Sequence, residues 1–598
     1  MAAAMSHGRR AALAGVLGLL ATAGSLGAAS SPAAAAGPNF QETWALHVPG
    51  VIALSSPVPA TIGGVPAVVV GDRNGVVHAV GLAGGHELPG WPVTVPGAHP
   101  VDSTPSVLGS QIFVGVGDAS QANGQMLGGY LALSDTGRVD WYRQVPLTPA
   151  GGQPWGVRSG MAVGQLQGVE AVVAGTMGQQ MSAFNAATGA TLRGFPWLSS
   201  DSEFSTPAIA DLYGNGQQEI ISGAAQTAGH YGSHVYTEGG HLRILPATGN
   251  AGTNSAIGGP LCDFTPNEAV DSSPAVGSFL AGGATGVVVG TSNEMPGVSA
   301  ENQLFAMTPG CKLAWTATLD GATLSSPALV DALGNGGQQV AEGTLAGSVY
   351  LLNGANGGTI WRTHLPAQVI GGVTSADLGG GYQDILAPTT AGLYILDGRS
   401  GAIVAHLDFN GVGLQNSALV TNDPNGTLGI TVAGYNAAGG EIVHYQLAGS
   451  NGAVADQAGA WPMFHNDPQL TGTALTGSAL RRLPVPVAPS SLAAGQRLAS
   501  GQQLTDSAGD ALVMQLDGNV VLYRGGRAVW ETGTYPHPGT SLLLTRSGDL
   551  QAIGANGAVL WSSRTSFGPT AQLVLRPGSP ALSLVRAGRV MWSAPMPR

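Results

Sequence analysis

Charged side chains are scarce in this chain, and lysine is nearly absent. Asp, Glu, Lys and Arg make up 9% of the 598 residues, against about 25% in typical globular domains. Lys312 is the only lysine, so reactions that depend on a lysine amine have almost no material. The formal net charge of −12 lacks the basic footprint that nucleic-acid-binding proteins carry. We therefore expect no nucleic-acid partner.

Long apolar runs are also lacking, except at the N-terminus. Residues 11–29 form an apolar run of small side chains behind Arg9 and Arg10, and residues 33–36 offer an A-x-A cleavage site. This order is typical of a secretory signal peptide. We predict a signal peptide over residues 1–36 and a secreted, extracellular protein without a membrane span after cleavage. An uncleaved membrane anchor is the alternative.

Cysteine is the third scarce residue, with Cys262 and Cys311 alone. An even number of cysteines in an exported protein predicts a disulfide. Such a bond would stabilise the fold by roughly 2–4 kcal/mol, mainly by restricting the unfolded chain. Two free, buried thiols are the alternative.

Glycine, in contrast, is abundant, at 94 residues, and it marks a repeated pattern. Each repeat opens with a Ser/Thr-Pro turn or a weaker version of it. An apolar strand, a Gly-rich turn and a second apolar strand ending in Gly follow. The opening turns fall near residues 55, 103, 159, 205, 272, 325, 374 and 416. A strand–turn–strand segment completes the repeat, with Trp141, Trp315 and Trp361 just after turn glycines.

Four short strands in each repeat are typical of the blades of a β-propeller. We predict an all-β chain with an eight-bladed propeller over residues 40–472. The count becomes seven if the first and last pieces share one blade. A β-helix is the rival fold, but its repeats are shorter.

The repeats resemble two propeller families, the FG-GAP/VCBS repeats of integrin-like propellers and the quinoproteins (PQQ-dependent dehydrogenases). The resemblance rests on the turn-glycine-Trp pattern and on the closing sequence AWPMFHNDPQLTG (460–472). It implies a propeller fold and leaves the function open. In the closing sequence, we interpret His465, Asn466 and Asp467 as residues that close the last blade, with a catalytic role as the alternative.

FG-GAP repeats bind calcium through loops of the form D-x-D-x-D-G-x-x-D, whose oxygen ligands suit a hard cation. The loop DLYGNGQQE keeps Asp211, Asn215 and Glu219 but has Tyr213 at the second ligand position. The loop DALGNGGQQ (331–339) ends in Gln where the pattern has Asp. We interpret both loops as turns without metal and expect no cofactor. Calcium at Asp211, Asn215 and Glu219 is the alternative.

A proline-rich spacer, LPVPVAPSS (483–491), separates the repeats from the C-terminal region, and we predict a linker over residues 473–491. Beyond it, tryptophans recur at equal steps of 31 residues, as Trp530, Trp561 and Trp592. Three equal units of short strands predict a threefold β-prism over residues 492–598. The large indole rings are expected to pack near its axis.

One stretch of this region carries candidate binding residues. MQLDGNVVLY (514–523) has Gln515, Asp517, Asn519, Val521 and Tyr523 at alternate positions, which share one face if the stretch is a β-strand. Their amides, carboxylate and phenol supply the donors and acceptors that sugar hydroxyls need. The spacing resembles the mannose-binding signature of the bulb-type (monocot) mannose-binding lectins, which implies a carbohydrate site at these five residues. An ordinary half-exposed strand with a turn-forming Asp-Gly-Asn is the alternative.

Each of the three units in that family can carry a mannose site, but two units here depart from the signature. The second unit has Thr545, Ser547, Asp549, Gln551 and Ile553 at the five positions, and the third has Arg576, Gly578, Pro580, Leu582 and Leu584. The second unit therefore lacks the phenol, and the third lacks nearly all of the polar groups. We expect the intact site in the first unit.

Together these patterns predict a secreted lectin that binds mannose-containing glycans or polysaccharide. The propeller would be a scaffold or would dock a protein partner, and we expect a binding protein rather than an enzyme. The alternative is a secreted propeller enzyme, PQQ-dependent or glycan-active, that the lectin module targets. The alcohol-oxidising quinoproteins carry two adjacent cysteines above the quinone, which this chain lacks. We also find no zinc spacing, nucleophile elbow or phosphate loop.

Overall fold

The computed structural model describes residues 38–594, apart from 118–127, 147–154, 200, 227–228, 232–233, 237–238, 250–259, 293–300, 410, 451–458, 476–490, 499–502, 507–509, 516–517, 525–526, 538–539, 577–580 and 588. The predicted signal peptide (1–36) lies outside the described residues. The described chain is all-β, as predicted, and its only helical elements are two short 3-10 turns, η1 (Pro96–Ala98) and η2 (Ala281–Gly283). No helix in this part of the chain is long and apolar enough to cross a membrane.

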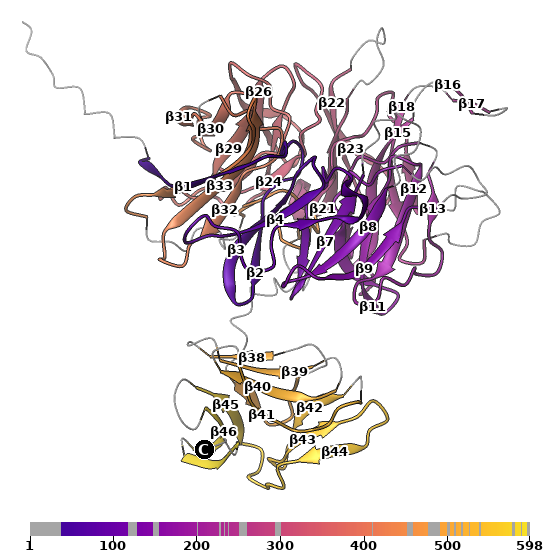
Figure 1. The fold of residues 1–598 in the computed structure, drawn as a ribbon. Coiled ribbons are helices and arrows are strands. Elements are labelled where there is room, and N and C mark those ends of the chain that lie inside the picture. Colours follow the sequence, from indigo (N-terminus) through magenta and orange to yellow (C-terminus); the bar gives the residue numbers. More distant parts are fainter. Residues whose placement is uncertain are drawn as a thin grey trace, which may run out of the picture.

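Eight sheets follow one another along the described part of residues 40–474 (Figure 1). The first three sheets are β2 (Val58–Ile62), β3 (Val65–Gly71), β4 (Val76–Gly81), β5 (Val93–Thr94); β6 (Ser106–Leu108), β7 (Gln111–Val116), β8 (Gly129–Ser134), β9 (Val139–Gln144); and β10 (Ala162–Leu166), β11 (Val169–Gly175), β12 (Gln180–Asn185), β13 (Trp197–Leu198). The fourth and fifth are β14 (Ala208–Ala210), β15 (Glu219–Gln226), β18 (Gly239–Leu245), β19 (Cys262–Phe264); and β20 (Ala275–Leu280), β21 (Ala284–Gly290), β22 (Gln303–Met307), β23 (Leu313–Thr318) with β35 (Thr473–Ala474). A separate hairpin, β16 (Gly229–Tyr231) and β17 (His234–Tyr236), extends from the fourth.

The last three of these sheets repeat the same plan. They are β24 (Ala328–Val330), β25 (Gln339–Gly343), β26 (Ser348–Asn353), β27 (Thr359–His364); β28 (Thr374–Ala376), β29 (Asp384–Thr389), β30 (Gly392–Leu396), β31 (Ile403–Leu407); and β32 (Leu419–Asn422), β33 (Leu428–Asn436), β34 (Gly439–Leu447), β1 (Phe40–Val48). The first strand of the chain thus completes the last sheet, antiparallel to β34. The first and last pieces do share a sheet, yet eight sheets are present.

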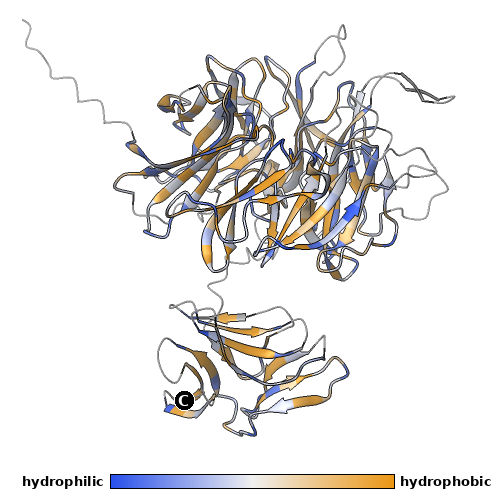
Figure 2. Cartoon of the chain, in the orientation of Figure 1, coloured by the Kyte–Doolittle hydropathy of each residue, from blue (hydrophilic) through white to orange (hydrophobic). Residues whose placement is uncertain are grey.

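The first strand of each sheet lies innermost and contacts the first strands of its two neighbours. These contacts run in sequence through β2, β6, β10, β14, β20, β24, β28 and β32, and β32 contacts β2 again. The region is therefore propeller-like. Figure 2 shows apolar residues along many of the strands, and strand residues such as Val68, Leu131 and Val340 are fully buried. The near-continuous apolar strands follow from burial between sheets on both faces.

The Ser/Thr pairs that open the repeats connect neighbouring sheets. The first hydroxyl stays in its own sheet, since Ser55 accepts from Gly71 N at 2.9 Å and Ser103 from Gly115 N at 2.8 Å. The second hydroxyl accepts from the backbone of the adjacent repeat. The bonds of this second kind are Ser56 N to Thr104, Gly160 N to Thr206, Thr206 N to Ser273, Ser273 N to Ser326 and Ser417 N to Ser56, at 2.8 to 3.1 Å. The motif therefore joins the repeats near the start of the inner strands.

The seventh sheet corrects one predicted turn. The residues before β28 that match the other pairs are Gly371 and Gly372, so Thr374 is the first residue of the strand and not the opening of a turn. A Cβ atom at Gly371 would lie 2.3 Å from the backbone oxygen of Asn416. The neighbouring repeat leaves no room for a side chain there, which explains why the Ser/Thr pattern fails at this repeat.

Tryptophans of outer strands hold several of the sheets against the next one. Trp141 Nε1 donates to Ala186 O at 2.7 Å and Trp361 Nε1 to Gly398 O at 2.8 Å, each in the following sheet. The indole rings pack against turn glycines of that sheet. A Cβ at Gly189 or Gly401 would lie 2.6 or 2.7 Å from an indole carbon. The recurring Trp of one sheet thus packs on the recurring turn glycine of the next sheet.

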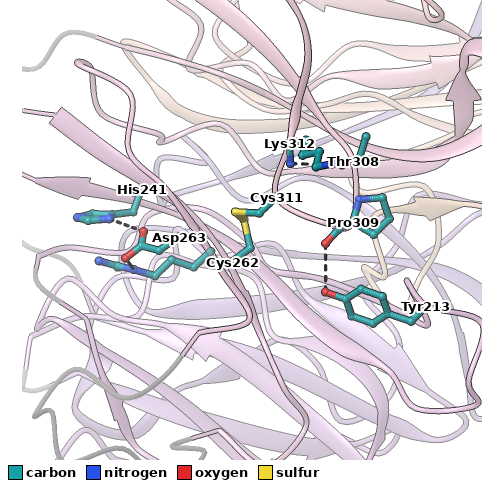
Figure 3. Close-up of a disulfide and its surroundings, with 9 residues drawn as sticks. Tyr213, His241, Cys262, Asp263, Thr308, Pro309, Cys311 and Lys312 are labelled. Carbon is teal, nitrogen blue, oxygen red and sulfur yellow. Dashed lines mark hydrogen bonds and ion pairs between the residues drawn. A yellow bond between two sulfur atoms is a disulfide. The ribbon is translucent and has the colours of Figure 1, made fainter.

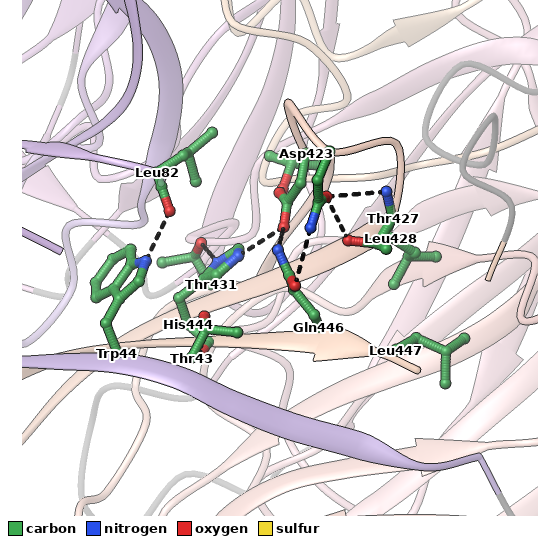
Figure 4. Close-up of polar contacts among 12 residues, drawn as sticks. Thr43, Trp44, Leu82, Asp423, Thr427, Leu428, Thr431, His444, Gln446 and Leu447 are labelled. Carbon is green, nitrogen blue, oxygen red and sulfur yellow. Dashed lines mark hydrogen bonds and ion pairs between the residues drawn. The ribbon is translucent and has the colours of Figure 1, made fainter. Parts of the chain in front are cut away.

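The same contact closes the ring at Trp44 of β1. Its Nε1 donates to Leu82 O of the first sheet at 2.7 Å (Figure 4), and its ring stacks on His444 with centroids 5.2 Å apart. The buried His444 Nε2 lies 2.9 Å from the Asp423 carboxylate, and Thr431 Oγ1 lies 2.9 Å from His444 Nδ1 (Figure 4). This network holds the N-terminal strand in the last sheet.

A closing segment, residues 459–474, crosses the ring of inner strands. On one side it accepts backbone bonds from the strands β6, β10, β14 and β20, from Val107 N to Pro468 O, Val163 N to Gln469 O, Ile209 N to Thr471 O and Val276 N to Gly472 O, at 2.7 to 2.9 Å. On the other side Ser375 N of β28 and Val420 N of β32 donate to Trp461 O and Pro462 O. The segment was expected to close the last blade alone, whereas it bonds to six inner strands.

The closing segment also shortens the predicted linker. Thr473 and Ala474 form β35, which pairs in parallel with β20, so they belong to the fifth sheet and not to a linker starting at 473. His465 Nδ1 lies 2.8 Å from Leu470 O, and Asp467 Oδ1 accepts from Thr471 N at 3.0 Å. Both side chains are therefore used within the segment itself. Residues 476–490 lie outside the described part of the chain.

The predicted disulfide is confirmed. Cys262 of β19 and Cys311 of the β22–β23 turn are bonded, with Cα atoms 5.3 Å apart (Figure 3). Beside it, Tyr213 Oη donates to Pro309 O at 3.1 Å (Figure 3). The disulfide and this hydrogen bond both tie the fourth sheet to the fifth.

The C-terminal region consists of three further four-stranded sheets. They are β38 (Gln503–Thr505), β39 (Ala511–Met514), β40 (Val520–Arg524), β41 (Arg527–Glu531); β37 (Arg497–Leu498), β42 (Ser541–Leu544), β43 (Leu550–Ile553), β44 (Val559–Ser562); and β36 (Ser491–Ala493), β45 (Gln572–Leu575), β46 (Leu582–Arg586), β47 (Arg589–Ser593). Leucines such as Leu522, Leu542 and Leu584 fill one apolar core between the sheets. Trp561 meets Trp530 and Trp592 edge to face, with centroids 5.6 and 6.4 Å apart.

Candidate functional site

The stretch 514–523 is not one strand, which corrects the sequence interpretation. Strand β39 ends at Met514 and β40 starts at Val520, and a turn connects them. Gln515 N donates to Asn519 O at 2.8 Å, and Gly518 N donates to Gln515 O at 3.1 Å. Gly518 has a φ of +93°, and a Cβ there would lie 2.0 Å from His537 O. Gly518 and Asn519 therefore lie in a tight turn that packs against the chain that follows β41.

The turn still brings the predicted residues together. A pocket of about 410 Å³ is lined by Gln515, Asn519, Val521, Tyr523, Ala528, Glu531, Gly533 and Tyr535. Four of the five predicted site residues are among them. The fifth, Asp517, lies outside the described residues. Pockets for small ligands have volumes of roughly 300–1,000 Å³, so this one is large enough for a sugar.

Hydrogen bonds fix the polar side chains of the pocket. Gln515 Nε2 donates to Tyr523 Oη at 2.8 Å, which leaves the phenol hydrogen directed away from that bond. Asn519 is 6% exposed; its Nδ2 donates to Glu531 Oε2 at 2.8 Å, and its Oδ1 accepts from Thr534 N at 3.1 Å. Amides and a phenol held in this way can exchange hydrogen bonds with the hydroxyls of a polyol.

Four lining residues were missed from the sequence: Ala528, Glu531, Gly533 and Tyr535. They belong to β41 and to the chain after it, outside the motif. Glu531 pairs with Val521 across the strands β40 and β41. A signal was present in the sequence, because a strand that follows the motif after a short turn pairs with it residue by residue. Tyr535 is 64% exposed at the pocket.

The second unit has the same turn but uses its polar groups internally. Asp549 matches Asn519, and its Oδ1 accepts from Ser563 Oγ at 2.8 Å and from Thr565 N at 3.1 Å. Its Oδ2 accepts from Ser562 Oγ and from Gln551 Nε2, both at 2.8 Å. Burial raises the pKa of Asp549, but these hydrogen bonds outweigh it and hold the pKa below the ordinary value. The carboxylate fixes the loop after β44.

In the third unit, the last three motif positions assigned from the sequence are wrong by one residue. Arg576 N donates to Ala581 O, so this turn has one residue more than the turns at 515–519 and 545–549. The structure therefore puts Ala581, Ser583 and Val585 at the positions assigned to Pro580, Leu582 and Leu584. Leu582 and Leu584 are fully buried in the core. Only Ser583 adds a hydroxyl to this unit, so it still lacks the polar set of the first.

The calcium candidates in the propeller-like region are bonded to their own turns. Asp211 Oδ1 and Oδ2 accept from Asn215 N at 3.0 Å and from Gly216 N at 2.8 Å. Glu219 Oε2 accepts from Leu212 N at 3.0 Å. Among the described residues, no group of three or more His, Cys, Asp or Glu side chains is arranged to hold a metal ion.

Three deeply buried groups of the propeller-like region have shifted pKa values. Burial raises the pKa of Glu203 to about 7 and that of Glu342 to about 8. Burial lowers the pKa of His465 to about 4. All three side chains are almost without solvent contact, so they are neutral or partly neutral near pH 7.

Neither a protein-family model nor a curated protein matches this sequence. Among solved structures, BamB from Moraxella catarrhalis is similar, with 13% identity and a TM-score of 0.44 over 68% of this chain and 100% of its own. A europium-containing methanol dehydrogenase has 10% identity and a TM-score of 0.47 over 68% of this chain and 93% of its own. A monomeric monocot mannose-binding lectin from Gastrodia elata has 27% identity and a TM-score of 0.16, over 18% of this chain and 96% of its own.

Proposed function

We propose that the protein binds mannose-type glycans in the pocket of its C-terminal region. The observation that carries this proposal is that Gln515, Asn519, Val521 and Tyr523 line one pocket, although the turn at 515–519 interrupts the strand. These residues are the ones that the resemblance to bulb-type lectins names for mannose binding. The second and third units, whose residues depart from the signature, bind mannose weakly or not at all.

In this proposal binding breaks no covalent bond. The amides of Gln515 and Asn519 and the phenol of Tyr523 exchange hydrogen bonds with sugar hydroxyls, and Val521 contacts the apolar face of the ring. Asp517, the fifth residue of the motif, accepts further hydrogen bonds from sugar hydroxyls. A single site of this kind binds with a Kd on the order of millimolar, because few atoms are buried and polar groups exchange water for sugar. Useful avidity then comes from polymeric glycans.

The remaining architecture is part of the same proposal. Residues 40–474 are an eight-bladed β-propeller that serves as a scaffold or docks a protein partner, and residues 492–598 are a β-prism lectin domain. The signal peptide sends the protein out of the cell, where its glycan ligands are found.

Calorimetric titration of the full chain with methyl α-mannoside tests the binding site. The Gln515→Ala variant is expected to weaken binding about tenfold, since it loses one amide that bonds the sugar. Thr545→Ala, at the matching position of the second unit, is the control and is expected to bind like the parent. Absence of binding by the parent protein, or equal effects of the two substitutions, would overturn the proposal.

A further inference from the structure

Glu531 is the only charged residue among the described residues that line the pocket. Its carboxylate accepts one hydrogen bond, from Asn519 Nδ2 at 2.8 Å, and its side chain is exposed. Arg524, the residue after Tyr523 in the sequence, has its Nε 2.7 Å from Asp510 Oδ2. Among the side chains that the structure describes, no cation forms an ion pair with Glu531.

The fold itself does not require a carboxylate at this position. The strand pairing that puts Glu531 opposite Val521 puts Ser562 opposite Gln551 and Ser593 opposite Ser583 in the other two units. In the second unit a short hydroxyl is sufficient, because Ser562 Oγ donates to Asp549. In the first unit the turn residue Asn519 donates to the strand residue Glu531, whereas in the second unit the strand residue Ser562 donates to the turn residue Asp549. In the first unit alone, the acidic group is on the strand that forms the pocket wall.

We propose that Glu531 makes the pocket selective for charge: it admits neutral glycosides and amino sugars and disfavours sugars that carry a phosphate or carboxylate. This inference rests on the proposed function and adds the class of glycan that the site accepts. Two like charges a few ångströms apart repel each other, and more strongly near a protein surface than in bulk water. The repulsion extends across the pocket, since the screening length is about 10 Å at 0.1 M salt.

Desolvation also weakens the binding of anionic sugars. A bound phosphate or carboxylate loses part of its water shell, and in this pocket no described cation replaces that water. An ammonium group would instead gain a charge-assisted hydrogen bond to the carboxylate. The predicted order of affinity is therefore amino-substituted, then neutral, then anionic mannose derivatives.

The test compares three ligands on the full chain at low salt: methyl α-mannoside, mannose 6-phosphate and 6-amino-6-deoxymannose. We expect the parent protein to bind the phosphate at least about tenfold more weakly than the neutral sugar. In Glu531→Gln, whose amide oxygen still accepts from Asn519, this ratio falls at least about threefold from the parent value, because one of the two acidic residues of the proposed site has lost its charge. In Asp549→Asn of the second unit the ratio stays at the parent value. Added salt brings the ratio of the two affinities closer to one in the parent protein and in Asp549→Asn, and changes it less in Glu531→Gln.

The outcomes distinguish failure of the role of Glu531 from failure of the glycan site. If the parent protein binds methyl α-mannoside but the ratio is the same in Glu531→Gln, the role of Glu531 is refuted and the glycan site remains. If the parent protein binds none of the three sugars, the proposed function fails and this inference fails with it. Thermal unfolding of both variants verifies that neither substitution has unfolded the region.

Discussion

Tyr523 pairs with Ala528 across the strands β40 and β41, on the wall of the pocket. The same register pairs Ile553 with Val559 and Val585 with Val590 in the other two units. A small side chain therefore lies beside the phenol in the first unit, where the other units have a β-branched one. The wall of the pocket thus has a small side chain at a position where the other two units have valine.

The substitution Ala528→Val should fill part of the pocket and weaken the binding of methyl α-mannoside at least about tenfold. Two added methyl groups at a contact with a ring displace it, and overpacking of this kind costs about 1–3 kcal/mol. Titration calorimetry measures the loss, and Val559→Ala in the second unit is the matched control. Unchanged affinity in Ala528→Val would show that the sugar does not use this wall.

The substitution Asn519→Asp separates the structural role of this residue from its binding role. The aspartate keeps an oxygen for Thr534 N, as Asp549 does for Thr565 N in the second unit. It replaces the amide that donates to Glu531 with a second carboxylate. We expect a variant that folds with a lower melting temperature, because the new carboxylate lies beside that of Glu531, and a loss of sugar binding of about tenfold or more. A variant that unfolds, or that binds sugar normally, contradicts this division of roles.

Features that recur along the chain, or whose residues lie close together in it, could be predicted from the sequence. The Ser/Thr-Pro pairs and the Trp–Gly contacts recur because most of the sheets meet a neighbour in one of these two ways, so the repeat is visible in the chain. The four motif residues of the pocket were found for a similar reason, because they lie close together in sequence. The interpretation of 514–523 as one strand was wrong, because polar residues at alternate positions occur in turns as well as in half-exposed strands.

Other features depend on partners that no local pattern identifies. The closing segment uses single backbone N–H groups of residues such as Val107, which is 361 positions before Pro468. A hydrogen bond between backbone atoms does not require particular side chains, so the sequence does not indicate it. Glu531 and Tyr535 were missed because they reach the pocket from outside the motif. The third unit was shifted by one because its turn is one residue longer.

The hydroxyl of Ser273 should contribute measurably to the stability of the propeller-like region. Its Oγ accepts from Thr206 N at 3.0 Å in the preceding repeat, and the residue is buried. Ser273→Ala leaves that N–H without its acceptor, which costs about 1–3 kcal/mol. Urea unfolding measures the loss. The exposed Thr188→Ala, which removes a hydroxyl from a surface turn, is the control and should lose less. Equal stabilities of both variants would refute a joining role for the pairs.

The buried Glu342 should make folding stability depend on pH. Burial raises its pKa from 4.5 to about 8, so between these values the folded chain holds a proton that the unfolded chain releases. Stability from this group is complete below pH 4.5 and declines as the pH rises towards 8, by up to about 1.4 kcal/mol for each pH unit. Glu342→Gln can still accept from Gly343 N but does not titrate.

The predicted result is therefore a stability advantage of Glu342→Gln over the parent that grows from pH 4.5 to pH 8. Urea unfolding at several pH values across this window measures it, and the other buried acids cancel in the difference between the two proteins. Parallel pH curves for the two proteins would show that Glu342 is ionised in the folded chain.

The most direct test of the proposed glycan site is saturation-transfer NMR on the full chain with methyl α-mannoside, a method suited to weak ligands. We expect saturation of the sugar ring protons in the parent protein and in Thr545→Ala. We expect loss of that signal in a variant that combines Gln515→Ala with Tyr523→Phe, which removes the hydrogen bond between these two side chains. No transfer to the parent protein, or equal transfer in the combined variant, would contradict the assignment of this pocket to mannose.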